Sequence, residues 1–143
     1  MAIVYTGGTF DLFHAGHVNF LWQCAKIAAS SGRVIVSLNT DSFVTKYKGV
    51  APIYTYLERE TLLKGCKYVS EVIPNEGGRD SKPSIMKVKP NFIAIGSDWA
   101  CKDYYKQMGF TQKWLDNWHI TLIYIPYTEG ISTTVLKQRI MNA

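Results

Sequence analysis

Short apolar runs that alternate with helical patterns constrain this chain more than any other feature of its sequence. Five runs predict strands, at residues 2–5, 34–38, 68–73, 92–95 and 121–125. The segments between them predict helices at 16–29, 57–64 and 84–89, and a closing helix at 133–141. Parallel strands need long crossovers, and strands buried on both faces read as continuous apolar runs. The pattern therefore predicts an α/β fold with a five-stranded parallel sheet and helices on both faces.

Length and composition narrow the class of protein. With 143 residues, 47% of them hydrophobic and 19% charged, the chain predicts one folded domain, residues 1–143, rather than a disordered segment. No apolar run approaches the ~20 residues of a membrane span, and no basic leader precedes the first strand. Cysteines at positions 24, 66 and 101 form no disulfide or zinc pattern, so we expect a cytoplasmic protein. The net charge of +5 suits an anionic small molecule and is too dispersed for a nucleic acid.

A polar cluster follows the first predicted strand and opens the first predicted helix. Within residues 8–17, His14 and His17 are three apart, with an Ala-Gly pair between them. A helix start favours anions, so both imidazoles can be aimed at one anion, and Gly16 lets the backbone approach closely. The structural alternative is a cap and a surface residue. A metal pair is a further alternative, but His119 is far away and no Cys, Asp or Glu recurs at ligand spacing.

A second cluster, residues 128–134, follows the last predicted strand and opens the last helix. Three hydroxyls in a row, Ser132, Thr133 and Thr134, come just after Gly130. One of them would serve as an ordinary N-cap. Three exceed that need and predict a backbone-and-hydroxyl cradle for phosphates.

These motifs together resemble the cytidylyltransferase-like nucleotidyltransferase superfamily. Gly8-Thr9-Phe10-Asp11 followed by His14-Ala15-Gly16-His17 resembles its signature. Residues 128–134 are similar to the phosphate-binding motif of its glycerol-3-phosphate and choline/ethanolamine-phosphate branch. Further matches are Thr40-Asp41, Lys46-Tyr47-Lys48, residues 56–59, 72–74 and 96–99. The resemblance covers residues 3–99 and 121–141 and implies a Rossmann-like nucleotidyltransferase fold.

The resemblance implies transfer of a cytidylyl group from CTP to a phosphorylated alcohol, with glycerol 3-phosphate the favoured acceptor, and release of pyrophosphate. A phosphomonoester is largely a dianion at pH 7 and attacks without a general base. The family chemistry further implies Mg²⁺ and a homodimer. It assigns catalysis to His14, His17 and Lys46, and acceptor binding to Lys46, Arg59 and a basic residue at Arg79 or Lys82. It assigns nucleotide binding to Thr9, Phe10, Asp11, Gly16, Lys48, Asp98, Tyr127, Thr128, Glu129, Gly130, Ile131, Ser132, Thr133 and Thr134.

Several of these roles have alternatives. Asp11 is a magnesium ligand, a partner that orients a histidine, or a turn-capping residue. Lys46 and Lys48 would share one side of an extended segment, and Arg59 is either a ligand or a helix-surface charge. The family motif usually begins with arginine, where this chain has Tyr127. The aromatic residues of 100–118 fit a dimer surface, a lid or additional core.

Alternatives also remain for the function. Phosphoethanolamine, phosphocholine and other polyol phosphates are alternative acceptors. The rival enzyme is an adenylyltransferase acting on a sugar phosphate, although the Ile-Ser-Thr-Thr ending and the Lys-x-Lys pair favour CTP. The alternative from another class is a catalytically silent nucleotide-binding domain.

Overall fold

The computed structural model describes residues 1–75, 80–97 and 103–143. Its elements in chain order are β1 (Ile3–Gly8), α1 (Ala15–Ala28), β2 (Arg33–Asn39), α2 (Asp41–Lys48), α3 (Tyr56–Lys64), β3 (Glu71–Asn75), α4 (Lys82–Val88), β4 (Phe92–Gly96), α5 (Tyr104–Met108), α6 (Gln112–Asn117), β5 (Thr121–Ile125) and α7 (Thr133–Met141). The five strands form one parallel sheet in the order β3-β2-β1-β4-β5. This confirms the predicted α/β fold class.

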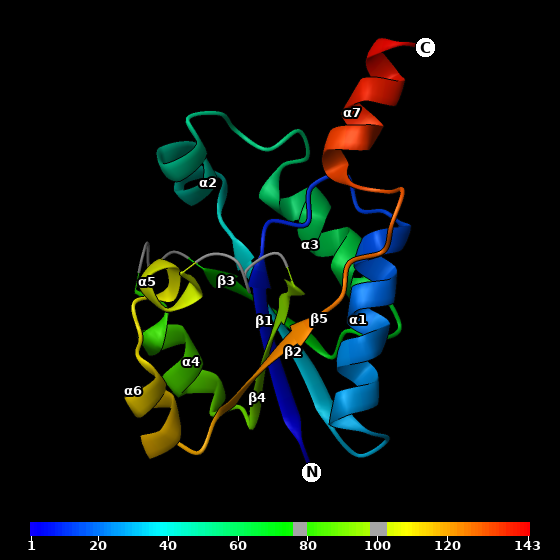
Figure 1. Ribbon diagram of the computed structural model, residues 1–143. Coiled ribbons are helices and arrows are strands. Elements are labelled where there is room, and N and C mark those ends of the chain that lie inside the picture. Colours follow the sequence, from blue (N-terminus) through cyan, green and yellow to red (C-terminus); the bar gives the residue numbers. More distant parts are fainter. Residues whose placement is uncertain (76–79, 98–102) are drawn as a thin grey trace.

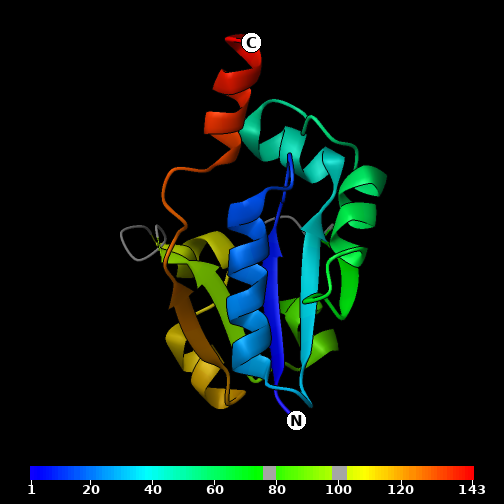
Figure 2. The same ribbon diagram turned by 90° about the vertical axis from the view of Figure 1, so that its right-hand side faces the viewer.

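Helices cover both faces of the sheet (Figures 1 and 2). On one face, α1 and α3 pack on a core that includes Val4, Leu21 and Leu63. On the other face, α4, α5 and α6 pack on a core that includes Tyr5 and Ile85. Neighbouring residues of β1 enter opposite cores because successive strand side chains point to opposite faces. The central strands are therefore buried on both sides, which explains their continuous apolar runs.

The third strand differs from its predicted span of 68–73. It begins at Glu71 and runs through Pro74 to Asn75. Proline lacks an N–H donor and is tolerated at the edge of a sheet, which is where β3 lies. Both ends of the predicted span were therefore wrong.

The segment that carries Lys46 and Lys48 is a helix, not an extended chain. The Thr40 side chain accepts a hydrogen bond from the Phe43 N–H at the start of α2, and Gly49 ends the helix with a φ of 79°. Residues two apart in a helix point about 200° apart. The expectation that both lysines share one side was therefore wrong.

The described part of the aromatic stretch, residues 103–118, forms α5 and α6. Tyr104, Phe110 and Leu115 are buried in the second core. This part of the stretch is thus additional core, as one of the three alternatives stated. Trp118 is exposed.

The sheet opens between β1 and β4. These strands pair only at Val4–Phe92 and Tyr5–Ile93, whereas β1 pairs with β2 along its whole length. The carboxyl half of β1 therefore parts from β4 where the strand order reverses. Open α/β sheets bind ligands in the crevice at this point. Among the described residues, no helix is long and apolar enough to cross a membrane.

Candidate active site

The loop between β1 and α1 is held in an uncommon backbone conformation. Phe10 and Leu12 have φ angles of 52° and 48°. The carboxylate of Asp11 accepts hydrogen bonds from the N–H groups of Leu12 (3.1 Å), Tyr54 (2.9 Å) and Ile53 (2.7 Å). Such conformations persist where surrounding contacts over-determine them. The structure therefore places Asp11 as the residue that holds the turn, which was one of its three predicted roles.

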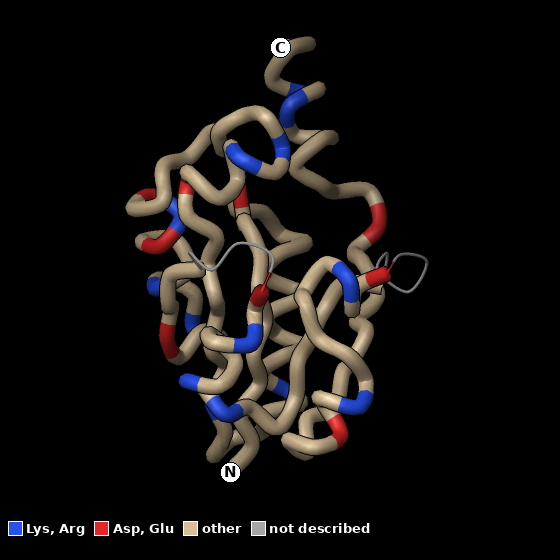
Figure 3. The backbone as a smooth tube through the Cα atoms, turned by 90° about the vertical axis from the view of Figure 1, so that its left-hand side faces the viewer, with Lys and Arg blue, Asp and Glu red and all other residues tan. Residues whose placement is uncertain are grey.

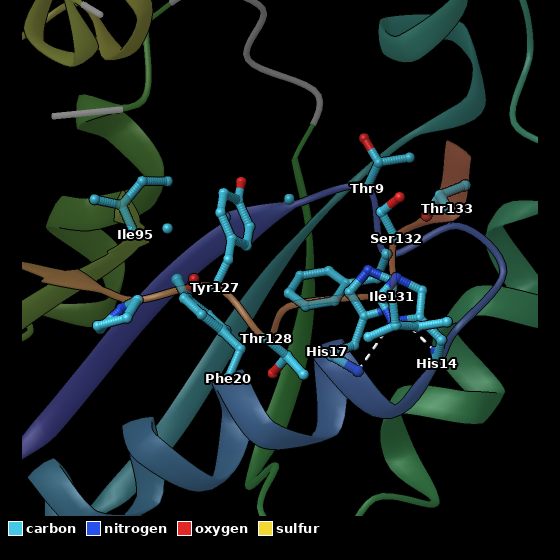
Figure 4. Close-up of a pocket in the computed structure, with 17 residues that line it drawn as sticks. Thr9, His14, His17, Phe20, Ile95, Tyr127, Thr128, Ile131, Ser132 and Thr133 are labelled. Atoms are coloured by element: carbon cyan, nitrogen blue, oxygen red, sulfur yellow. Dashed lines mark hydrogen bonds between the residues drawn. The ribbon is translucent and has the colours of Figure 1, made fainter. Parts of the chain in front are cut away.

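The two histidines stack at the start of α1. Nδ1 of His14 accepts from the Gly16 N–H at 3.0 Å, and Nδ1 of His17 accepts from the His14 N–H at 3.1 Å. The ring centroids are 3.7 Å apart. A Cβ atom on Gly16 would lie 2.8 Å from the His14 ring, so only glycine allows this approach. Figure 4 shows the two rings beside Ile131.

These hydrogen bonds fix the tautomers of both rings. Because each Nδ1 accepts, each neutral ring carries its proton on Nε2. Burial and the neighbouring His14, opposed by Asp11, lower the pKa of His17 to about 3. Burial also lowers the pKa of His14. At pH 7 the pair is therefore neutral and offers two adjacent Nε2–H donors.

The loop of residues 128–134 is docked onto the histidine loop. The Thr133 hydroxyl donates to the Asp11 carbonyl at 3.0 Å. Ser132 caps α7, since its Oγ accepts from the Val135 N–H at 3.1 Å. A hydroxyl that accepts keeps its own proton to donate. The capping alternative is thus confirmed for Ser132, and its hydroxyl proton remains available for an anion.

Two cavities meet at these loops. The first, of about 400 Å³, lies between β1, β4 and the loop before α7, and the second, of about 580 Å³, lies between β1, α2, α5 and α7. Their shared wall consists of Gly7, Gly8, Thr9, Phe10, His17, Ile95, Tyr127 and Thr133. Figure 4 shows Tyr127 on the other side of the first cavity from the two histidines. A ligand in each cavity would therefore meet the other near His17.

Most predicted nucleotide-binding residues line the first cavity. They are Thr9, Phe10, Gly16, Tyr127, Thr128, Ile131, Ser132 and Thr133, together with both histidines. Glu129, Gly130 and Thr134 line neither cavity. Asp98, Trp99 and Arg79 lie outside the described residues.

The three lysines predicted as site residues differ in whether they line a cavity. Lys48 lines the second cavity, whereas the exposed Lys46 and the half-buried Lys82 line neither. Sequence reasoning missed Lys137 of α7, which does line the second cavity. Its signal is its position four residues after Thr133, which puts it on the same helical face. Figure 3 shows basic positions on α7 near the C-terminal end of the backbone.

Arg59 is fully buried, so the alternative of a helix-surface charge is wrong. Its guanidinium donates to the carbonyls of Tyr54 (3.1 Å), Thr9 (2.9 Å) and Asn39 (2.8 Å), and pairs with Asp41 at 2.6 Å. Four of its five N–H groups are thereby used. The structure places Arg59 against the loop that carries Thr9, where it lines neither cavity, and does not support direct contact with an acceptor phosphate.

Two asparagines were also missed. The Nδ2 group of Asn19 donates to Thr128 Oγ1 at 3.1 Å and ties α1 to the loop before α7. The Nδ2 group of Asn39 donates to Thr9 Oγ1 at 3.1 Å. The available signal for Asn39 was a polar residue at the carboxyl end of a predicted strand, where ligands of such sheets bind.

The site combines neutral N–H donors at a helix start with a hydroxyl-bearing loop at the switch point of a parallel sheet, and these features favour an anion. The family model described as cytidylyltransferase-like matches residues 5–139. Glycerol-3-phosphate cytidylyltransferase of Bacillus subtilis (strain 168) is 32% identical over 141 residues, which are 98% of each chain. The chain belongs to the cytidylyltransferase-like family, and it is a nucleotidyltransferase.

Two other similarities are to proteins with different names. FAD synthase of Korarchaeum cryptofilum (strain OPF8) is 35% identical over 105 residues, 73% of this chain and 70% of the relative. The solved structure of the lipopolysaccharide core biosynthesis protein from Thermoplasma volcanium GSS1 has a TM-score of 0.69 at 26% identity, and the match covers 92% of this chain and 99% of that one. These proteins resemble the chain in sequence or in structure but carry different names, so the substrates of this chain need a separate argument.

Proposed function

We propose that this enzyme transfers a cytidylyl group from CTP to glycerol 3-phosphate, which yields CDP-glycerol and pyrophosphate. The observation that carries the proposal is the pair of neutral Nε2–H donors: His14 lines the first cavity, and His17 lies in the wall that the two cavities share. The full-length similarity to glycerol-3-phosphate cytidylyltransferases supports the choice of both substrates.

In the proposed reaction a phosphate oxygen of the acceptor attacks the α-phosphorus of CTP. The new O–P bond forms as the bond from the α-phosphorus to the bridging oxygen of the β-phosphate breaks, and pyrophosphate leaves with that electron pair. The attacking group is largely a dianion at pH 7, so no proton needs to be removed. Catalysis then depends on positioning and on stabilisation of developing negative charge.

The two histidines supply the donors for that charge. Because both rings are neutral, each gives one Nε2–H hydrogen bond to the α-phosphate and has no ring proton that must first be lost. Their Nδ1 bonds to backbone hold the rings in place before substrate arrives. Preorganised donors of this kind stabilise a transition state by about 3 kcal/mol each.

Positive charge for the phosphates comes from two helices. Among the described residues that line the two cavities, Lys48 of α2 and Lys137 of α7 are the side chains with a fixed positive charge. Arg59 is paired with Asp41. We therefore assign Lys48 and Lys137 to the phosphates, in place of Lys46 and Arg59.

Magnesium remains a prediction from the resemblance. Mg²⁺ is usually held by one or two carboxylates, substrate phosphates and water. Asp11 does not fit this role, because both of its oxygens accept backbone hydrogen bonds. No group of three or more His, Cys, Asp or Glu gathers within residues 1–75, 80–97 and 103–143. No step of the proposed reaction is derived through the metal.

The second candidate function is adenylyl transfer, which the similarity to FAD synthases favours. A pyrophosphate-release assay that crosses the four nucleoside triphosphates with glycerol 3-phosphate, phosphoethanolamine, phosphocholine, sugar phosphates and FMN separates the two. We expect the highest kcat/KM with CTP and glycerol 3-phosphate, and mass spectrometry should identify CDP-glycerol. A preference for ATP would contradict the proposal.

Binding gives an independent check of the base. A ligand that binds only the folded state raises its stability with the logarithm of concentration over Kd. With Mg²⁺ present, we expect CTP to raise the melting temperature more than ATP at equal concentration. The homodimer, which the resemblance implies, is tested by sedimentation of the same samples.

A further inference from the structure

Three polar side chains form a row along the carboxyl edge of the sheet. Asn75, the last residue of β3, donates from Nδ2 to Asn39 Oδ1 at 2.9 Å, and Asn39 donates to Thr9 Oγ1 at 3.1 Å. Asn39 and Asn75 are also register partners in neighbouring strands. The row thus runs from Thr9, in the wall shared by the two cavities, outward to β3.

The outer end of this row has an unsatisfied acceptor. Asn75 is only 9% exposed, and its Oδ1 has no hydrogen-bond partner in the described part of the chain. Leaving a buried polar atom unpaired is costly, so most such atoms in native proteins pair with protein, ordered water or a ligand. Asn75 Oδ1 therefore lacks a donor among the described residues, and a bound water or ligand can supply one.

Asn75 lines the second cavity, together with Lys48, Lys137 and His17. It also borders a third cavity along α4, which contains neither histidine and neither of these lysines. The second cavity therefore brings the two cationic side chains and the Asn75 side chain to the border of one space. β3 lies two strands from β1, or about 10 Å. That span suits a phosphate with a short chain attached.

We infer that Asn75 Oδ1 accepts a hydrogen bond from a hydroxyl group of the acceptor, so that the acceptor is a short-chain polyol phosphate rather than an alkyl or quaternary-ammonium phosphate. The inference rests on the proposed function and deepens it. The phosphate of the acceptor would lie near Lys48, Lys137 and His17, and its hydroxyl group near Asn75. Binding at both ends would orient the attacking oxygen toward the α-phosphorus. Asn75 is thus a specificity-determining residue that sequence reasoning did not single out.

The test compares acceptors that differ only in hydroxyl groups. Glycerol 3-phosphate, the phosphates of 1,2-propanediol and 1,3-propanediol, and n-propyl phosphate are assayed with CTP on the full chain. A site built to bind a hydroxyl rejects an analogue that lacks it, so we expect kcat/KM for n-propyl phosphate to be at least about 100-fold lower. The two diol phosphates identify which hydroxyl is bound.

The ratio of kcat/KM for glycerol 3-phosphate to kcat/KM for n-propyl phosphate is then measured in Asn75→Ala and Asn75→Ser, either of which removes the amide oxygen. We expect the ratio to fall to about tenfold or less in whichever variant folds, whereas the exposed Asn117→Ala should keep the parent value. A purely structural role would lower kcat/KM for all acceptors equally and leave the ratio unchanged. That result, or equal use of glycerol 3-phosphate and n-propyl phosphate by the parent, would overturn the inference while the proposed function stands.

If no acceptor turns over with any nucleotide, the proposed function fails instead. The hydroxyl preference is then read from calorimetric binding of glycerol 3-phosphate and n-propyl phosphate to the parent and the Asn75 variants. Tighter binding of glycerol 3-phosphate that disappears in the variants supports the role of Asn75. Equal binding of the two ligands to the parent refutes it.

Discussion

At the scale of single residues, His14 and His17 divide their ring nitrogens between two tasks. Nδ1 of each ring accepts from a backbone N–H, which leaves the Nε2–H to donate to the proposed substrate. In His17→Ala the donor and the hydrogen bond to the His14 N–H are both lost. We expect kcat to fall at least 100-fold, since a donor of this kind contributes about 3 kcal/mol. Steady-state kinetics on purified protein measure it.

The matched control replaces the remaining histidine. His119 is exposed and has a φ of 56°, which asparagine tolerates better than most residues. His119→Asn should therefore keep parental turnover. Near-normal kcat in a folded His17→Ala protein would remove His17 from the catalytic group.

Tyr127 lies at the position where the family motif usually has arginine. Its side chain is 61% exposed and lines both cavities, so it leaves room for a longer side chain. Arginine would add charge-assisted hydrogen bonds to phosphate oxygens. We expect Tyr127→Arg to lower the nucleotide KM about five- to thirtyfold, which corresponds to about 1–2 kcal/mol. A raised KM would indicate that the site depends on tyrosine.

At the scale of elements, α7 places one basic side chain at the second cavity and another outside it. Lys137 lines the cavity, whereas Arg139 on the same helix does not. We expect Lys137→Gln to weaken binding of inorganic triphosphate about fivefold, a modest effect because the side chain is exposed, and Lys137→Arg to restore it. Calorimetry in low salt measures this. Arg139→Gln removes the same charge and serves as control; an equal loss in both would point to a diffuse field.

The elements that the sequence predicted well are those with strong periodicity. The apolar runs around Val4, Ile35 and Ile93 gave the strands, because burial on both faces demands continuous apolar residues. The helix at Asp41–Lys48 was missed, although Thr40 and Gly49 are ordinary start and stop signals. The alternating lysines of the Lys-x-Lys pattern favoured an extended segment instead.

Side-chain partners were harder to predict than elements. The motifs gave His14, His17 and the loop of residues 128–134, because anion binding at a helix start leaves a local signature. Nothing local in the sequence shows that Arg59 is buried or that Asn75 ends a row of amides. Such roles depend on which strands become neighbours, and this is set by the whole fold.

At the scale of the whole molecule, the site links stability to pH. The pKa of His17 is about 3 in the folded chain, against an ordinary value near 6.5 in the unfolded chain. Between these values the unfolded chain binds more protons, so the free energy of unfolding decreases as pH falls below about 6.5. The slope contributed by His17 approaches about 1.4 kcal/mol per pH unit. Urea unfolding at pH 7, 6 and 5 measures it.

The same unfolding series identifies the group responsible. His17→Ala should reduce the slope between pH 7 and 5. Carboxyl groups ordinarily titrate below this window, and His14, whose pKa burial also lowers, contributes to the slope that remains. A parental slope in His17→Ala would mean that His17 is charged in the folded protein.

The closing helix α7 should open locally at a lower free energy than the central strands of the sheet. None of the residues of α7 is buried, and Figures 1 and 2 show the helix projecting beyond the sheet. Its link to the histidine loop is the Thr133 hydroxyl on the Asp11 carbonyl. Segments with few buried contacts open at a fraction of the global free energy. Amide hydrogens of residues 133–141 should therefore exchange faster than those of β1, and a bound nucleotide, by occupying the loop before this helix, would slow them. Part of the nucleotide's binding free energy is then spent on ordering the end of the chain.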